Sequence, residues 1–178
     1  YDRDLKKRKY CVSDPLTKVV GIESKNPMSP RVLRVDTVGD RMKLASRQAK
    51  VFGLAIKDRA SILMSGHAAD AAYWMEKNNW VTTEYYRPDL PSYLQALNAA
   101  NFLDAYRGKQ WKLLHPQAKY RNIGPDKNDW ENPPKGFDTE FPHDIFKPGE
   151  GGPDDLDDQV LASPFGNEVT LSAAKELV

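Results

Sequence analysis

The sequence has one cysteine, Cys11, and no excess of charge of either sign. A single cysteine cannot form an internal disulfide, which excludes a scaffold held together by cystines. With 26 Lys and Arg against 25 Asp and Glu, the formal net charge is +1, so the composition gives no general electrostatic reason to expect nucleic acid as a partner. No apolar run approaches the roughly 20 residues of a membrane-spanning helix. We therefore expect neither a nucleic-acid partner nor a membrane partner.

Metal-binding patterns are also scarce. The three histidines, His67, His115 and His143, lack the paired spacing of a zinc site. Ser65 and His67 are two positions apart, but no matching carboxylate or oxyanion motif follows. This favours His67 as a hydrogen-bonded turn residue over a member of a serine triad. The acidic run 154–158 resembles half of a calcium loop without its alternation and closing Glu, and is interpreted as a solvated loop. The chain is predicted to bind no metal by itself.

The composition changes along the chain. Residues 30–114 contain most of the periodic apolar pattern, whereas residues 115–167 contain most of the prolines and the glycine-rich run that precedes the acidic residues. We expect the first stretch to be an ordered α/β part. The second is predicted to be a loop-rich insertion, whose scattered aromatic residues hold its loops against a neighbouring surface.

Two elements precede the region of greatest interest. A helix is predicted over residues 37–46, capped by Thr37, with Val38, Met42 and Ala45 on one apolar face. The apolar run 50–56 suits a strand that is buried on both faces. A helix followed by a buried strand is typical of an α/β sheet.

Two further elements follow that region. Residues 72–86 are rich in aromatic and β-branched side chains around a polar turn at 76–79, which predicts a β-hairpin. Pro91 is suited to the first turn of a helix that extends to Gly108. The predicted fold class is therefore α/β, with a partial sheet, flanking helices, a hairpin and a long loop-rich insertion.

The most informative charges are Lys57, Asp58 and Arg59, directly after the predicted strand. They are expected at the carboxyl edge of the sheet, where open α/β folds bind their ligands. On an extended backbone Lys57 and Arg59 project to the same side and Asp58 to the other. Two cations facing one point suit a tetrahedral dianion, although the spacing alone favours an ordinary surface salt bridge at a strand end.

Four segments carry a resemblance to a known family: YDRDLKKRKYCVSDP, NPMSPRVLRVDTVGDRMKLAS, KVFGLAIKDRASILMSGHAADAAYWM and SPFGNEVT. Together they resemble the middle of the PafA-type bacterial alkaline phosphatases, which are relatives of the nucleotide pyrophosphatases and phosphodiesterases. In that family the Lys and Arg of a K-D-R motif bind the transferring phosphoryl group, and Lys57 and Arg59 match them. The resemblance therefore favours phosphoryl binding over a surface salt bridge.

The resemblance further implies phosphate monoester hydrolysis through a threonine nucleophile and two zinc ions, in a periplasmic or secreted enzyme. None of the positions for the nucleophile or the zinc ligands is found here, so the 178 residues look like one internal fragment of a larger hydrolase domain. Alone, this fragment is expected to be inactive and to self-associate through exposed apolar faces. Two alternatives stay open: a nucleotide pyrophosphatase or phosphodiesterase, and a non-catalytic module that binds phosphate or a partner.

Overall fold

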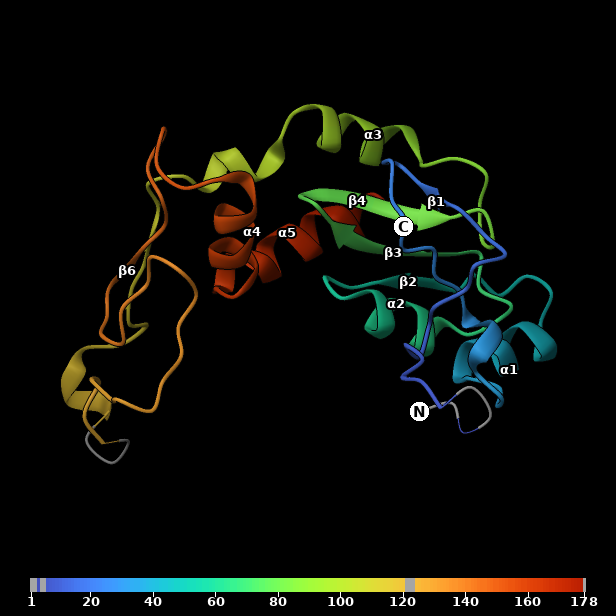
Figure 1. Cartoon of the computed structure of the whole chain (residues 1–178), viewed down its shortest axis with the longest axis horizontal. Helices are drawn as coiled ribbons and strands as arrows, with labels where there is room; N and C mark the ends of the chain where they lie inside the picture. The colour runs from blue at the N-terminus through green and yellow to red at the C-terminus, as the bar shows by residue number, and fades with distance from the viewer. Residues whose placement is uncertain (1–2, 4–5, 121–123, 178) are drawn as a thin grey trace. The chain divides into compact units, whose positions relative to one another are not determined.

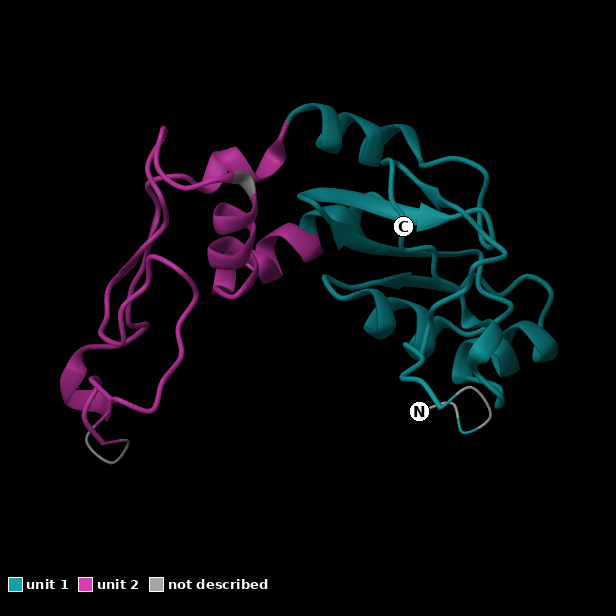
Figure 2. Cartoon of the chain, in the orientation of Figure 1, with its two compact units in different colours: residues 1–100, 172–178 teal, residues 101–171 magenta. Residues whose placement is uncertain are grey.

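A computed structural model describes residues 3, 6–120 and 124–177 of the chain. The chain divides into two compact units, residues 1–100 with 172–178 and residues 101–171 (Figure 2). In the described ranges, no helix is both long enough and apolar enough to cross a membrane.

The first unit is built on a mixed sheet, which has four strands within the described residues. Their spatial order is β1 (Val19–Val20), β4 (Asn79–Thr83), β3 (Ala71–Glu76) and β2 (Phe52–Leu54). The β1–β4 and β4–β3 pairs are antiparallel, and the β3–β2 pair is parallel. Helix α2 (Asp58–Ser65) packs on β2 and β3, and α3 (Ser92–Ala99) packs on β4 (Figure 1). The predicted α/β class is confirmed.

The hairpin of β3 and β4 forms where the aromatic and β-branched residues predict it. Glu76 pairs with Asn79, and the two residues between them, Lys77 and Asn78, have φ values of 49° and 64°. A two-residue turn with positive φ at both positions matches the right-handed twist of the flanking strands. The hairpin thereby places Trp74 opposite Val81, and both side chains are buried.

The core of the first unit joins the hairpin to α2 and to the N-terminal segment. A single buried cluster contains one residue from that segment, one from α2 and three from the hairpin: Val12, Ile62, Ala72, Trp74 and Val81. The partly buried Tyr10 packs against the same cluster. Burying a side chain such as Val12 or Ile62 contributes roughly 1.5–3 kcal/mol, and this packing holds the N-terminal segment against the helix.

Helix α1 (Val38–Ala45) has the predicted bounds and cap, and it follows a short 3-10 helix, η1 (Pro30–Val32). The Thr37 hydroxyl accepts a hydrogen bond from the Asp40 amide at 3.1 Å, and the Asp40 carboxylate accepts one from the Thr37 amide at 2.9 Å. This reciprocal pair is a capping box. The predicted apolar face is not covered, however, because Val38 is 79% exposed and Met42 is also exposed.

The strand predicted over residues 50–56 is shorter and less buried than expected. Only Phe52–Leu54 is a strand, and within the described residues it pairs on one side only, with β3. Phe52 is 40% exposed. The expectation of a strand buried on both faces is therefore wrong within the described residues, because the Phe52 side chain is exposed. Strand β2 also lies at the edge of the sheet that these residues form.

The helix predicted from Pro91 to Gly108 is also wrong in its extent. Helix α3 ends at Ala99, and Asn101 adopts a left-handed conformation with φ 47°. A 3-10 helix, η2 (Phe102–Tyr106), follows. The left-handed residue breaks the hydrogen-bond ladder, so one periodic apolar pattern gives two separate elements.

The second unit contains a small antiparallel pair and two helices. Strand β5 (Gln110–Trp111) pairs with β6 (His143–Asp144), and a 3-10 helix, η3 (Gln117–Tyr120), follows β5. Helix α4 (Pro153–Leu161) packs on η2, and α5 (Pro164–Lys175) follows it.

The acidic run 154–158 lies inside α4, so its interpretation as a solvated loop is wrong. The Asp155 carboxylate accepts a hydrogen bond from the Gly152 amide at 3.0 Å, and acidic side chains in a first turn favour helix formation. Leu156 and Val160 are buried and anchor the helix. The loop-rich part of the chain is consequently shorter than residues 115–167.

Candidate functional site

The predicted cations lie at the start of α2. Lys57 is the N-cap residue, with an extended backbone (φ −95°, ψ 130°), and Arg59 is the second residue of the helix. The alternation expected for an extended chain therefore does not apply beyond Lys57, because the backbone turns into a helix at Asp58. Lys57 therefore lies just before the first turn of α2 and Arg59 lies within it, instead of both lying on an extended strand.

Gly53 allows α2 to pack closely against β2. A β-carbon at this position would overlap the Ser65 hydroxyl and the Ser61 carbonyl oxygen, so only glycine fits without a shift of the helix. The Ser65 hydroxyl itself donates a hydrogen bond to the Ser61 carbonyl at 2.6 Å. Helix α2 begins shortly after β2 ends, and its close packing holds its first turn beside that end of the strand. The free amides of this first turn carry partial positive charge.

Asp58 is turned toward the protein interior, with only 4% of its surface exposed. Its Oδ1 atom accepts hydrogen bonds from the Tyr10 hydroxyl, at 2.7 Å, and from the Arg59 amide. Its Oδ2 atom lies 3.7 Å from the Lys57 ammonium. A buried carboxylate needs such partners, because an unpaired buried charge is costly.

The cationic groups themselves are accessible. The Lys57 side chain is 61% exposed, and its only ion pair within the described residues is the one with Asp58. Arg59 is exposed, and its guanidinium forms no ion pair or hydrogen bond with those residues. Both can meet a ligand from solvent. A guanidinium offers a fork of two hydrogen bonds to phosphoryl oxygens, and an ammonium offers a compact charge.

The contact between Tyr10 and Asp58 was not predicted from the sequence. The two residues are 48 positions apart, and neither periodicity nor a motif links them. Burial and the hydrogen bond to Asp58 raise the pKa of Tyr10 to about 12. The phenol therefore stays protonated, and remains a donor, well above the usual tyrosine pKa of about 10.

His67 is a hydrogen-bonded turn residue, as predicted. Its Nε2 atom donates to the Leu33 carbonyl at 3.1 Å, and its Nδ1 atom lies 3.5 Å from an Asp40 carboxylate oxygen. The adjacent Gly66 has φ +83°, and a β-carbon there would meet the side chains of Thr37 and Asp40. These contacts join the end of α2 to the start of α1.

The side chains of the described residues form no cluster that could bind a metal ion. Among residues 3, 6–120 and 124–177, no three His, Cys, Asp or Glu side chains gather in a way that could hold a metal ion. These residues alone therefore do not fit the two-zinc site that the resemblance implies for the larger protein.

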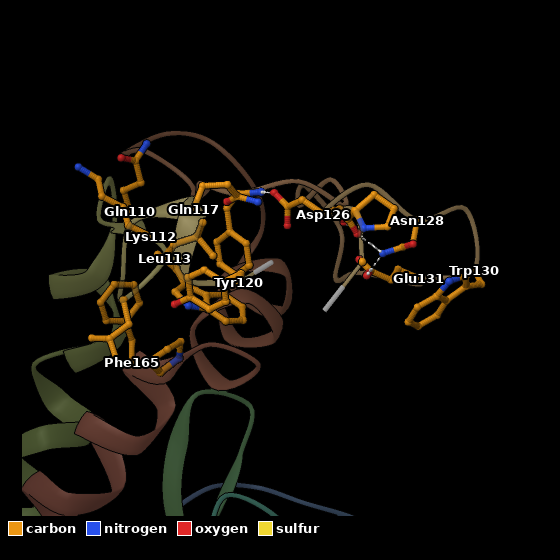
Figure 3. Close-up of a pocket in the computed structure, with 16 residues that line it drawn as sticks. Gln110, Lys112, Leu113, Gln117, Tyr120, Asp126, Asn128, Trp130, Glu131 and Phe165 are labelled. Carbon is orange, nitrogen blue, oxygen red and sulfur yellow. Dashed lines mark hydrogen bonds between the residues drawn. The ribbon is translucent and has the colours of Figure 1, made fainter. Parts of the chain in front are cut away.

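The second unit contains a separate cavity of about 760 Å³ (Figure 3). Its wall is largely aromatic and apolar, and includes Trp111, Tyr120, Trp130, Phe141 and Phe165. Trp111 and Phe141 also contact the His143 ring, which fits the prediction that aromatic residues hold these loops. Trp130 differs from that prediction, because it is 80% exposed and lies at one end of the cavity.

Curated proteins match the chain along almost its whole length. No family model matches. A protein of Myroides odoratus named calcium-transporting ATPase is 38% identical over 174 residues, which are 95% of this chain and 31% of that protein. The alkaline phosphatase PhoV of Synechococcus elongatus is 34% identical over 184 residues, 100% of this chain and 32% of PhoV. The alkaline phosphatase PafA of Elizabethkingia meningoseptica is 34% identical over 181 residues, which are 98% of this chain and 32% of PafA.

Solved structures agree with the sequence matches. The crystal structure of wild-type alkaline phosphatase PafA superposes with a TM-score of 0.81 and 32% identity, covering 98% of this chain and 34% of that one. The crystal structure of a PafA variant with four substitutions superposes with a TM-score of 0.79 and 31% identity. The chain thus spans about one third of the length of the relatives it matches. In sequence and in fold, it belongs with the PafA-type alkaline phosphatases, of which it matches one segment.

Proposed function

We propose that this chain supplies the phosphoryl-binding cations, Lys57 and Arg59, of an enzyme that hydrolyses phosphate monoesters. The observation that carries the proposal is the position of both exposed cations around the first turn of α2. Helix N-termini favour anions, because their amides are free and the helix dipole is positive there. Two relatives named alkaline phosphatases support the choice of reaction.

The solved PafA variant also supports the choice of residues. Its four substitutions replace a threonine, an asparagine, a lysine and an arginine, and the lysine and the arginine are two positions apart. Lys57 and Arg59 have the same spacing. We infer that the two pairs are equivalent.

The preference for monoesters follows from charge. A phosphate monoester presents two negative charges to the site and a diester presents one, so two cations stabilise bound monoester and its transition state more strongly. Arg59 would donate two hydrogen bonds to a pair of phosphoryl oxygens, and Lys57 would contact a third. Asp58 leaves a net local charge of about +1 from these three side chains.

We propose that the threonine nucleophile and the ligands of two zinc ions lie in parts of the protein outside these 178 residues. When bound, zinc activates a nucleophile and stabilises a leaving oxygen. The role of this chain is to bind and orient the phosphoryl group. A periplasmic or secreted location is proposed on the same family resemblance.

The decisive experiment compares Lys57→Ala and Arg59→Ala with the unchanged full-length enzyme. Loss of one such donor is expected to lower kcat/KM for a monoester by on the order of 10²-fold or more, and to lower it far less for a diester. Arg41→Ala, which removes an exposed guanidinium on α1, is the control and is expected to change neither. Equal losses on both substrates, or no loss on either, would overturn the assignment.

A second assay concerns the 178 residues alone. With zinc added, they are expected to show no phosphatase turnover, because the chain matches only about a third of the enzymes it resembles. Turnover by this chain would show that nucleophile and metal ligands lie within it.

A further inference from the structure

The two carboxylate oxygens of Asp58, the buried residue between Lys57 and Arg59 in the sequence, have different partners. The proposed function does not use these contacts. Asp58 Oδ1 faces the N-terminal segment and the backbone, where it accepts from the Tyr10 hydroxyl and the Arg59 amide. Asp58 Oδ2 faces the Lys57 ammonium at 3.7 Å. One carboxylate thus connects both cation-bearing residues to a third segment of the chain.

We propose that Asp58, held by the Tyr10 hydroxyl, is a positioning residue that orients Lys57 and the first turn of α2 toward the phosphoryl group. This inference rests on the proposed function of Lys57 and Arg59. It adds Tyr10 and Asp58 to the residues that determine the preference for monoesters. Both would act through Lys57 and the first turn of α2, without contacting the substrate.

The distance from Lys57 to Asp58 fits a positioning role. At 3.7 Å, the two atoms attract each other as an ion pair but are too far apart for a good hydrogen bond. All three ammonium donors therefore remain available to phosphoryl oxygens. The attraction still restricts a long side chain that is otherwise 61% exposed, and this lowers the entropy lost when it binds a ligand.

Tyr10 is a rigid anchor for the carboxylate. Its ring packs against the core cluster of Val12, Ile62, Ala72, Trp74 and Val81, so the hydroxyl is fixed relative to α2. Because the pKa of Tyr10 is raised to about 12, the hydroxyl stays a donor in alkaline solution. Without it, Asp58 Oδ1 would keep only the Arg59 amide as a hydrogen-bond donor within the described residues.

A purely structural role is the alternative. Asp58 is the first residue of α2, where a negative charge stabilises any helix through the dipole. Such a role would alter folding stability and would affect monoester and diester hydrolysis equally. The ratio of the two activities therefore separates positioning from structural support.

The test uses Tyr10→Phe and Asp58→Asn in the full-length enzyme. Tyr10→Phe keeps the ring in the core cluster and removes only the hydroxyl. Tyr86→Phe is the matched control, because Tyr86 packs against the same cluster and donates a hydrogen bond at 2.9 Å to the Gly66 carbonyl, not to Asp58. For each variant, kcat/KM is measured with a monoester and a diester, together with inhibition by inorganic phosphate and the Tm.

We expect Tyr10→Phe to lower kcat/KM for the monoester roughly 10-fold and Asp58→Asn up to about 10²-fold, since small misplacements of reacting groups cost that much. Phosphate should inhibit both variants more weakly, and the diester activity should change much less. The double variant should lose no more than Asp58→Asn alone, because both changes act through one carboxylate. If Asp58→Asn does not fold, Tyr10→Phe decides.

Two outcomes would overturn the inference while the proposed function stands. The first is a Tyr10→Phe enzyme with the same activities as Tyr86→Phe. The second is an equal loss of monoester and diester hydrolysis in Tyr10→Phe or Asp58→Asn. Both apply when Lys57→Ala and Arg59→Ala change the ratio of the two activities as proposed. If Lys57→Ala and Arg59→Ala leave that ratio unchanged, the proposed function fails and the inference fails with it.

Discussion

Asp40 Oδ1 accepts a hydrogen bond of 2.7 Å from the backbone amide of Ala68, 28 residues farther along the chain. Its Oδ2 atom accepts from both the amide and the hydroxyl of Thr37. One buried carboxylate therefore caps α1 and holds the turn that follows α2. These hydrogen bonds lower the pKa of Asp40 although burial alone would raise it.

Replacing Asp40 with Ala should therefore destabilise the first unit strongly. The change removes a capping carboxylate and leaves the amides of Thr37 and Ala68, whose hydrogen bonds are part-buried, without their acceptor. Each such loss costs about 0.5–2 kcal/mol. We expect a decrease in the free energy of unfolding of about 3 kcal/mol, measured by urea unfolding. Asp36→Ala is the control, because Asp36 forms an exposed ion pair with Arg41 at 3.0 Å, and exposed pairs contribute about 0–1 kcal/mol. Similar losses in the two variants would contradict the dual role of Asp40.

A second prediction concerns pH and the second unit. Burial, together with the nearby carboxylates of Asp158 and Asp154, raises the pKa of Asp157 to about 6. A carboxyl group whose pKa is raised on folding stabilises the fold below the unfolded pKa of about 4, and this contribution is lost as pH rises to about 6. The second unit should therefore become less stable between pH 4 and 6, by at most about 3 kcal/mol from this group.

Asp157→Asn should remove that loss. Its second unit should unfold at higher urea concentration than the unchanged protein at pH 7.5, and the pH dependence between 4 and 6 should flatten. Asp154→Asn, at an exposed position of the same helix, should leave most of the dependence in place. An unchanged pH profile in Asp157→Asn would show that Asp157 titrates as an ordinary surface carboxylate.

A third prediction concerns self-association of the 178 residues alone. Exposed apolar side chains, including Val38, Met42, Phe52 and Met64, border a groove of about 400 Å³ beside β2. Within the described residues the outer edge of β2 is unpaired, and such edges associate readily. We expect a concentration-dependent dimer of this chain in sedimentation velocity.

The variant Met64→Lys should weaken that dimer, because it places a charge in the groove. Leu114→Lys introduces the same charge at an exposed apolar position of the second unit and should not. A chain that stays monomeric at millimolar concentration, or a dimer that both variants weaken equally, would contradict a β2-centred interface.

Local features of this fold could be predicted from the sequence. The Thr37–Asp40 capping box depends on residues three positions apart, and the turn at Lys77 and Asn78 depends on two adjacent residues. Both are determined by short-range sterics and hydrogen bonding. The α/β class follows from them and from the apolar run that contains β2.

Features that depend on distant residues could not be predicted in the same way. The burial of β2 depends on which elements cover its two faces, and its pairing depends on whether a strand lies on its outer side. Residues 50–56 encode neither. Helix α4 was missed because its many aspartates resemble a loop, whereas Leu156 and Val160 stabilise it through tertiary burial. In the candidate site, spacing and resemblance identified the pair Lys57 and Arg59. The sequence analysis did not predict that the backbone becomes helical at Asp58, between them.

Helix α5 begins in the second unit and ends in the first, whose last residues are 172–178. The first unit is therefore discontinuous in the chain, and the whole second unit is synthesised between its two parts. Since a chain emerges from the ribosome N-terminus first, residues 1–100 leave it long before Ala173, which is fully buried in the finished protein. During translation the first unit therefore lacks its last segment, residues 172–178, until the second unit has been synthesised.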